Sequence, residues 1–236
     1  MSNPVAILRH VAPFDAASDK AMAEIVRVTT TRTLQRGTVL WRGGDAPSAF
    51  SVIHSGLVKI VRELPNGREA IVGVFGPRES IGEVAIVRGT TYPAAAVVCS
   101  DSATLLQIPR DAFLGWIRGS TELSARMTQS LADRLHAMHS KVEILSAGSV
   151  ESRMAALLLD LSRRFGDDFD DGSVSIPIAL SRQELASLVS TSFETAIRVM
   201  SKWQKKGVLE TRPDGFVIRD MELLRQAAAT VLGART

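Results

Sequence analysis

SRQELASLVSTSFETAIRVMSKWQKK, residues 181–206, has the pattern of two short helices joined by a tight turn. Ser181 and, three residues later, Glu184 form the capping-box pattern that begins a helix. The turn is expected at residues 189–191, and Ser192 is a suitable N-cap for the second helix. This layout is typical of a helix-turn-helix unit, whose second helix enters the major groove of DNA. An ordinary amphipathic helical hairpin is the alternative.

The second helix of this stretch has two chemically different sides. At about 100° per residue, apolar side chains gather on one side: Phe193, Ala196, Ile197, Met200 and Trp203. The other side collects polar and charged side chains: Glu194, Arg198, Ser201, Lys202 and Lys205. Residues 181–206 contain five Lys or Arg against two Glu, in a chain whose net charge is only +3. This excess of cations favours DNA as the partner, although such a stripe is often only a solvated surface.

Composition sets the broad class of the protein. A chain of 236 residues with 45% hydrophobic and 22% charged residues is globular and long enough for two domains. Its one cysteine, Cys99, excludes an intramolecular disulfide and a cluster held by four protein thiolates, and is expected in a buried strand. Without a signal-like start or a membrane-length apolar run, we expect a soluble, cytoplasmic protein with no membrane partner.

Residues 34–109 have the texture of a β-domain, in which short β-prone runs alternate with Gly, Pro, Asn and Asp. The strands are expected at residues 38–41, 49–53, 57–63, 69–75, 94–99 and 103–108. Pro65-Asn66-Gly67 is a strong hairpin signal between two of them. Many short strands at this spacing predict a barrel or jelly roll, preceded by a helix at residues 16–29.

Beyond Asp111 the pattern becomes helical, with a narrow apolar seam on a helix of about 25 residues. The seam consists of Met127, Leu131, Leu135, Met138, Val142 and Leu145. Such a seam suits pairing with a second copy of the chain. The alternative is packing against the chain's own β-domain, and both can hold at different ends. Gly148-Ser149 is the expected hinge.

After the hinge, residues 150–165 predict another helix, followed by an acidic loop at residues 166–172. The Asp spacing does not match a calcium loop, so we interpret this segment as a solvated loop and expect no metal site. A strand at 174–178, a hairpin of strands 208–210 and 215–219, and a closing helix from Met221 complete a winged helix. The predicted fold is α+β: a β-roll at residues 1–112, a dimerisation helix at 113–147 and a winged helix-turn-helix domain at 148–236.

This order of elements resembles the CRP/FNR family of bacterial transcription regulators over about residues 15–219. The resemblance is carried in the β-roll by Gly37, Gly44-Asp45, Gly56, Gly67, Gly76 and Gly82-Glu83. In the C-terminal part it is carried by Arg182-Gln183-Glu184-Leu185-Ala186 and Ser192-x-Glu194-Thr195-x-x-Arg198. It implies a homodimer that binds a two-fold symmetric site in double-stranded DNA, with RNA polymerase as a further partner. No phosphate loop, metal-ligand cluster or nucleophilic constellation points to an enzyme.

The resemblance also places the base-reading positions on Glu194 and Arg198, which lie four residues apart on one helix face. A Glu carboxylate accepts from the cytosine N4 amine, and Arg makes a bidentate contact with guanine O6 and N7. An intrahelical Glu–Arg pair is the alternative. The predicted contacts with the DNA backbone are Arg182, Ser192, Thr195, Lys202 and Lys205.

Two positions depart from the family pattern. Ser190 occupies the turn position where many members have Gly. Phe193 stands where cyclic-AMP regulators have Arg, so that one base contact is lost. Phe193 either touches a thymine methyl group or packs inward, and we favour inward packing.

The resemblance places the effector pocket around Gly82, Glu83, Val84, Arg88, Tyr92, Pro93 and Ala94. Cyclic-nucleotide-binding relatives carry Arg-Ser where this chain has Pro93-Ala94. Proline lacks an N–H and alanine lacks a hydroxyl, so this pair cannot grip an anion and cyclic AMP is disfavoured. Glu83 also fits a structural role in capping the turn, and Arg88 is a possible substitute cation.

The identity of the effector stays open. The iron–sulfur cluster of the oxygen-sensing members is excluded because the N-terminal region has no cysteine. Thr91-Tyr92-Pro93-Ala94 resembles the branch that controls denitrification and nitric oxide responses, whose proposed sensor is haem. The possible haem ligands are His10, His54, His136 and His139, although each also fits a surface or hydrogen-bonded role. A haem-dependent gas sensor and a cyclic-nucleotide receptor acting on a protein partner are therefore the alternative functions.

Overall fold

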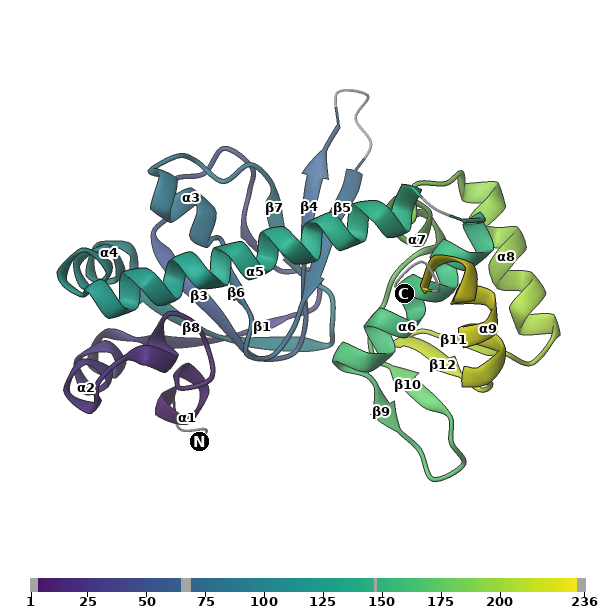
Figure 1. Cartoon of the computed structure of the whole chain (residues 1–236), viewed down its shortest axis with the longest axis horizontal. Helices are drawn as coiled ribbons and strands as arrows, with labels where there is room; N and C mark the ends of the chain where they lie inside the picture. Colours follow the sequence, from purple (N-terminus) through teal and green to yellow (C-terminus); the bar gives the residue numbers. More distant parts are fainter. Residues whose placement is uncertain (1–3, 65–68, 147, 233–236) are drawn as a thin grey trace. The chain divides into compact units, whose positions relative to one another are not determined.

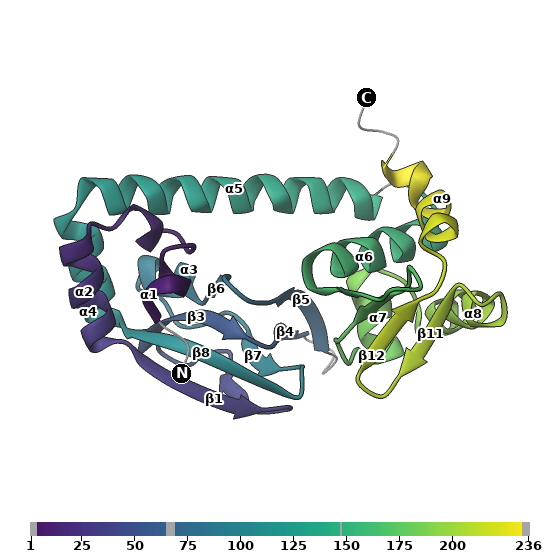
Figure 2. The same cartoon turned by 90° about the horizontal axis from the view of Figure 1, so that it is seen from below.

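The computed structural model describes the backbone of residues 4–64, 69–146 and 148–232, and their side chains except at 137, 139–146 and 230–232. The chain forms two compact units, Met1–His136 and Ala137–Thr236. Their elements are labelled in Figure 1 and seen from a second direction in Figure 2. Among the described residues, none of the helices combines the length and hydropathy that a bilayer crossing needs.

The first unit is built on two four-stranded antiparallel sheets within the described residues, ordered β1-β8-β3-β6 and β2-β7-β4-β5. The strands are β1 Thr30–Gln35, β2 Val39–Trp41, β3 Ala49–Ser55, β4 Val58–Glu63, β5 Glu69–Phe75, β6 Ser80–Ile81, β7 Ala95–Val98 and β8 Ser102–Pro109. Residues from both sheets share one buried cluster, which includes Trp41, Ile53, Val58 and Leu105. The predicted β-roll is therefore confirmed, while the Pro65-Asn66-Gly67 turn lies outside the described residues.

Three features of this unit differ from the sequence prediction. Strand β1 was not predicted because its sequence TTRTLQ is polar and mostly exposed, as is common for a strand with only one neighbour, here β8. The helix predicted from residue 16 begins only at Asp19, because Ser18 accepts the N–H of Ala21 and caps it. Cys99 is buried as expected, but it follows the end of β7.

Helices form a second buried cluster on the β3–β8 sheet. They are α1 Pro4–Leu8, a 3-10 turn at Phe14–Ala16, α2 Asp19–Val28 and α4 Arg110–Gly119; the short α3 Glu83–Arg88 lies between β6 and β7. The Phe50 and Phe113 rings stack with centroids 4.3 Å apart, and Phe14 meets Phe50 edge-on at 5.4 Å. This aromatic group fixes the helices on the sheet.

The long helix α5, Thr121–Ser146, is labelled in Figure 2 and includes the positions of the predicted seam. Met127 is buried in the helix-covered cluster and Leu131 packs against it. Leu135 and Met138 are instead 55% and 61% exposed. The side chains of Val142 and Leu145 lie outside the described residues. The first part of the seam therefore packs on the chain's own β-roll, and the next part presents apolar surface without a partner in the described chain.

The second unit contains a helix-turn-helix pair and a small antiparallel sheet ordered β11-β12-β10-β9. Its elements are α6 Val150–Phe165, β9 Asp167–Asp168, β10 Val174–Ile176, α7 Arg182–Leu188, α8 Phe193–Lys205, β11 Leu209–Arg212, β12 Gly215–Ile218 and α9 Met221–Leu232. The β11–β12 hairpin is the predicted wing, and a winged helix is confirmed. The predicted acidic loop is wrong in one part, because Asp167 and Asp168 pair with β10 through their backbone while they remain exposed.

Candidate DNA interface and effector site

The helix-turn-helix begins and turns as the sequence predicts. The Ser181 hydroxyl accepts the Glu184 N–H at 3.2 Å, and the Glu184 carboxylate accepts the Ser181 N–H at 2.7 Å, which completes the capping box. Ser192 caps α8 by accepting the N–H of Thr195 at 3.2 Å. Between the helices, Ser190 has a left-handed backbone with φ +52°. A left-handed conformation is unfavourable for a residue with a Cβ, so the turn is strained at this position.

Replacing Ser190 with Gly is expected to raise the free energy of unfolding by about 0.5–1 kcal/mol. Glycine removes the Cβ strain, and its greater freedom in the unfolded chain offsets part of the gain. Urea unfolding of the native chain and the variant measures the difference. Ser187→Gly, at a helical position in the last turn of α7, is the matched control and should lower the free energy of unfolding instead. A clear loss of stability in Ser190→Gly would contradict the strain at this turn.

The buried face of α8 consists of Ala196, Val199, Met200 and Trp203. Phe193 and Ile197 are instead 41% and 37% exposed. The prediction that these two side chains belong to the inner side, and that Phe193 packs inward, is therefore wrong. The reason is the spacing: the buried positions follow i, i+3, i+4 and i+7, which centres the inner side away from Phe193 and Ile197.

The predicted base-reading residues lie on the exposed side of α8, near its start. Glu194 lies in the first turn, and Arg198 lies one turn later. Among the described residues, the Arg198 guanidinium contacts the Thr195 hydroxyl at 3.5 Å, a distance at which a hydrogen bond is weak. Most of the donors of Arg198 can therefore face a base edge.

The predicted backbone contacts are in different situations. Lys202 forms an ion pair with Glu151 at 2.7 Å, so its ammonium has to share or leave that carboxylate to reach a phosphate. Arg182 donates to the Thr211 hydroxyl at 2.7 Å and is partly buried, which ties α7 to the wing. Lys205 is exposed in the last turn of α8.

Two residues in the first turn of α6 hold the helix-turn-helix in place, and the sequence did not predict them. The Glu151 carboxylate accepts from the Trp203 indole at 3.1 Å as well as from Lys202. The Arg153 guanidinium donates to the carbonyl of Val189 at 3.1 Å, and to those of Ser190 and Gly148 at 3.5 and 3.3 Å. A cation in the first turn of a helix opposes the helix dipole, and this signal could have marked Arg153.

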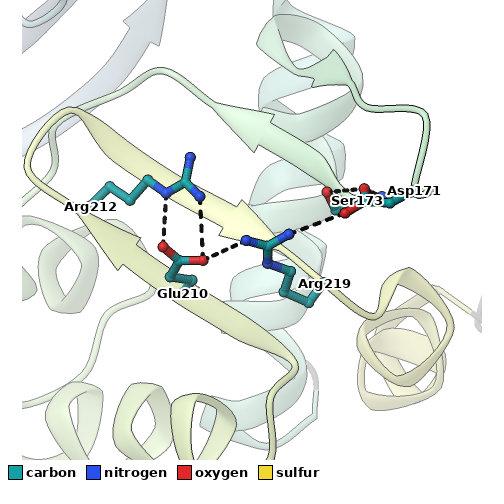
Figure 3. A network of polar contacts seen from close by, with 5 residues as sticks. All are labelled: Asp171, Ser173, Glu210, Arg212 and Arg219. Atoms are coloured by element: carbon teal, nitrogen blue, oxygen red, sulfur yellow. Dashed lines mark hydrogen bonds and ion pairs between the residues drawn. The ribbon is translucent and has the colours of Figure 1, made fainter.

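The wing is fixed by a chain of exposed ion pairs, shown in Figure 3. Glu210 accepts from Arg212 at 2.9 Å and from Arg219 at 2.8 Å, and these hydrogen bonds hold the pKa of Glu210 at about 2. Arg219 also pairs with Asp171 at 3.2 Å. Hydrogen bonds from Ser173 lower the pKa of the Asp171 carboxyl. One residue of the predicted acidic loop therefore anchors the wing.

Tight packing occupies much of the predicted effector pocket. The Trp41 and Tyr92 rings stack with centroids 4.2 Å apart, and the Trp41 indole donates to the Ala94 carbonyl at 3.1 Å. Gly82 has φ +83°, and a Cβ there would lie 2.8 Å from the Tyr92 ring, so only glycine fits. Burial raises the pKa of Tyr92 to about 12, with smaller contributions from Glu83 and Asp45. Of the remaining predicted pocket residues, Val84, Arg88 and Pro93 are exposed.

Arg134 of α5 brings a positive charge to the predicted pocket at Glu83. Its guanidinium pairs with Glu83, which is only 4% exposed, and donates to the Ser80 hydroxyl at 2.8 Å. The Glu83 Oε2 atom is buried without a hydrogen-bond partner among the described residues. Arg88, which we considered as the pocket cation, is instead exposed. Arg134 follows Leu131 by three residues, so both side chains lie on the same face of α5. This spacing in the sequence could have indicated that Arg134 faces the β-roll.

Family comparisons agree with both units. The cyclic nucleotide-binding domain family matches residues 31–120, and the Crp-like helix-turn-helix domain family matches residues 152–227. The chain belongs to the CRP/FNR family of transcription regulators. It is therefore a DNA-binding regulator of transcription and not an enzyme.

Individual CRP/FNR relatives differ in the effector that their names record. A CRP-like cAMP-activated global transcriptional regulator of Mycobacterium tuberculosis is 28% identical over 222 residues, covering 94% of this chain and 98% of the relative. The cyclic AMP receptor protein of Thermus thermophilus is 29% identical, covering 84% and 87%. The solved structure of the c-di-GMP responsive regulator CLP of Xanthomonas campestris has a TM-score of 0.66 at 26% identity, covering 86% and 100%. Membership of the CRP/FNR family therefore leaves the effector of this chain undetermined.

The histidines considered as haem ligands in this CRP/FNR regulator lie on different elements. His10 is exposed after α1, His54 is half-buried in β3 and His136 is exposed on α5. The side chain of His139 lies outside the described residues. Within the described parts of the chain, no three His, Cys, Asp or Glu side chains are grouped to hold a metal ion.

Burial raises the pKa of Glu83 above its usual value, although Arg134 opposes the shift. The folded protein then binds a proton more readily than the unfolded chain, so this contribution to stability grows as pH falls through the folded pKa and is lost as pH rises. Glu83→Gln should therefore be at least as stable as the native chain at neutral pH, and this advantage should shrink towards about pH 5. Urea unfolding at neutral pH and at about pH 5 measures this difference in the free energy of unfolding. Glu122→Gln, at an exposed position, is the control. An advantage that grows on acidification would contradict the prediction.

Proposed function

We propose that this CRP/FNR regulator acts as a homodimer that reads a two-fold symmetric operator with Glu194 and Arg198. The observation that carries the proposal is the seam of α5, which is buried at Met127 but 55% and 61% exposed at Leu135 and Met138. Two apolar side chains one turn apart on a long helix are stabilised when a second copy covers them. A two-fold dimer presents two α8 helices, which fit half-sites about one DNA turn apart.

The chemistry of the side chains divides the proposed DNA contacts into base contacts and phosphate contacts. Glu194 and Arg198 would read a cytosine amine and a guanine edge, which specify the sequence. Arg182, Ser192, Thr195, Lys202 and Lys205 would contact phosphates, which position the protein without specifying bases. The proposed domains are residues 1–112, 113–147 and 148–236, and RNA polymerase in the cytoplasm is the proposed further partner.

For the effector, we propose a molecule other than cyclic AMP. Proline at position 93 has no N–H, and the Ala94 carbonyl already accepts from the Trp41 indole. Neither residue offers the charged or hydroxyl donor that a cyclic phosphate needs. The sequence Thr91-Tyr92-Pro93-Ala94 resembles the branch of the CRP/FNR family that responds to nitric oxide. This resemblance supports assigning the chain to that branch.

Three measurements on the 236-residue chain test these parts separately. Sedimentation velocity should show a dimer. Calorimetry with cyclic AMP and cyclic GMP should show no saturable heat, and tight binding of either would overturn the effector proposal. An absorption spectrum after haem reconstitution gives the third result, since a Soret band would identify a haem-dependent sensor with the same DNA-binding domain.

A further inference from the structure

The recognition helix exposes two large apolar side chains beside its charged groups. Phe193, the first residue of α8, is 41% exposed, and Ile197, one turn later, is 37% exposed. Within the described part of the chain, no aromatic contact engages the Phe193 ring. Contiguous apolar surface bordered by polar groups is typical of binding surfaces, and these two neighbouring side chains form a small surface of that kind.

Helix geometry places this pair along one edge of the base-reading side. At about 100° per residue, Ile197 lies about 60° from Glu194 around the helix axis and about 100° from Arg198. The buried stripe of Ala196 and Met200 lies on the other side of Phe193 and Ile197. The exposed face therefore has an apolar edge next to a centre that carries the carboxylate and the guanidinium.

We propose that Phe193 and Ile197 contact the 5-methyl groups of thymines that neighbour the base pairs read by Glu194 and Arg198. The thymine methyl is the apolar group that base pairs present in the major groove, and phenyl and aliphatic side chains recognise it by contact. The apolar edge continues directly from the proposed base-reading face, so DNA that reaches Glu194 and Arg198 also covers it. This inference rests on the proposed DNA reading by α8.

The geometry also predicts where these thymines lie. Phe193 begins α8, and the N-terminal residues of a recognition helix contact base edges. Ile197 lies four residues, about 6 Å, further along the helix axis, which corresponds to about two base pairs of DNA. Each half-site should therefore contain two thymines that are close together and lie next to the base pair that Arg198 reads.

Replacing single thymines with deoxyuridine in the operator selected by this protein tests the inference, because uracil lacks only the methyl group. Losing contact with one methyl corresponds to about a fourfold weaker binding constant. Substituting the equivalent thymine in both half-sites should then weaken binding about 16-fold, whereas other thymines should be insensitive. Fluorescence anisotropy at fixed salt measures both operators.

Protein variants identify the side chain that senses each methyl. Each of the variants Phe193→Ala and Ile197→Ala should lose its sensitivity to one of the two methyl groups. At that operator position it should bind thymine and uracil equally, and at the other position it should still prefer thymine as the native chain does. Leu223→Ala, an exposed apolar residue of α9, should keep the full preference at both. If uracil weakens binding nowhere, or if the variants keep the native ratio, the inference is overturned although DNA binding stands.

Two other outcomes are distinguishable. If the chain binds no specific duplex, the proposed function itself fails. In the second outcome, replacing thymine with uracil leaves the binding constant unchanged, but Phe193→Ala lowers transcription at full operator occupancy. The apolar pair then contacts a protein partner, and the thymine assignment is wrong.

Discussion

Replacing Leu135 with Glu is expected to abolish operator binding at concentrations where the native chain is fully bound. Leu135 is 55% exposed on the α5 seam and becomes buried in the proposed dimer. Because Leu135 is already partly covered in one copy, the substitution removes about 0.8–1.6 kcal/mol of apolar burial from each copy, and it brings two carboxylates together across the two-fold axis. A loss of about 3 kcal/mol already weakens dimerisation more than 100-fold. Sedimentation velocity and operator anisotropy measure the two effects.

Leu223→Glu is the matched control for this prediction. Leu223 is a 45% exposed leucine on α9, outside the seam, so the same substitution adds the same charge at a similar exposure. This variant should stay dimeric and bind the operator like the native chain. Thermal unfolding of both variants checks that the fold is intact around Leu135, where the neighbouring Arg134 of α5 pairs with Glu83 of the β-roll. A dimeric Leu135→Glu with native operator affinity would contradict dimerisation through α5.

Replacing Arg198 with Ala is expected to remove the preference for one G·C pair in each half-site. A bidentate contact from Arg to guanine is worth about 1–3 kcal/mol of discrimination, so the two half-sites together lose about 2–6 kcal/mol. Selection from random duplexes with the variant and the native chain shows which position loses its preference. Competition with operators that carry A·T at that position gives the magnitude.

Arg225→Ala is the control for Arg198, since it removes the same charge from an exposed arginine of α9. It should leave the selected sequence unchanged. Unchanged selection by Arg198→Ala would show that this guanidinium does not read a base. A uniform loss across all sequences would instead indicate a phosphate contact.

The parts of the fold that could be predicted depend on local signals. Helix α6 begins and ends at Val150 and Phe165 as predicted, with Ser149 as its N-cap. The capping box of Ser181 and Glu184 is likewise present with both hydrogen bonds. Such caps involve residues three or four positions apart, so the sequence alone determines them.

The parts that could not be predicted depend on tertiary packing. Arg134 pairs with Glu83 across 51 positions, and Lys202 pairs with Glu151 across 51 positions. The spacing from Leu131 indicates which face of α5 carries Arg134, but no local pattern specifies the partner residue in either pair. The helical spacing shows that Phe193 lies at the edge of the apolar side of α8, but whether neighbouring helices cover that edge depends on their shape, which the spacing does not contain.

Selection of bound duplexes from a random-sequence pool tests the DNA-reading function most directly. The native dimer should enrich a two-fold symmetric site with a G·C pair at equivalent positions of two half-sites, about 10 base pairs apart from centre to centre. Binding should weaken steeply with salt, because phosphate contacts release counterions. Recovery of no symmetric site, with or without cyclic nucleotides or haem, would contradict sequence-specific reading by Glu194 and Arg198.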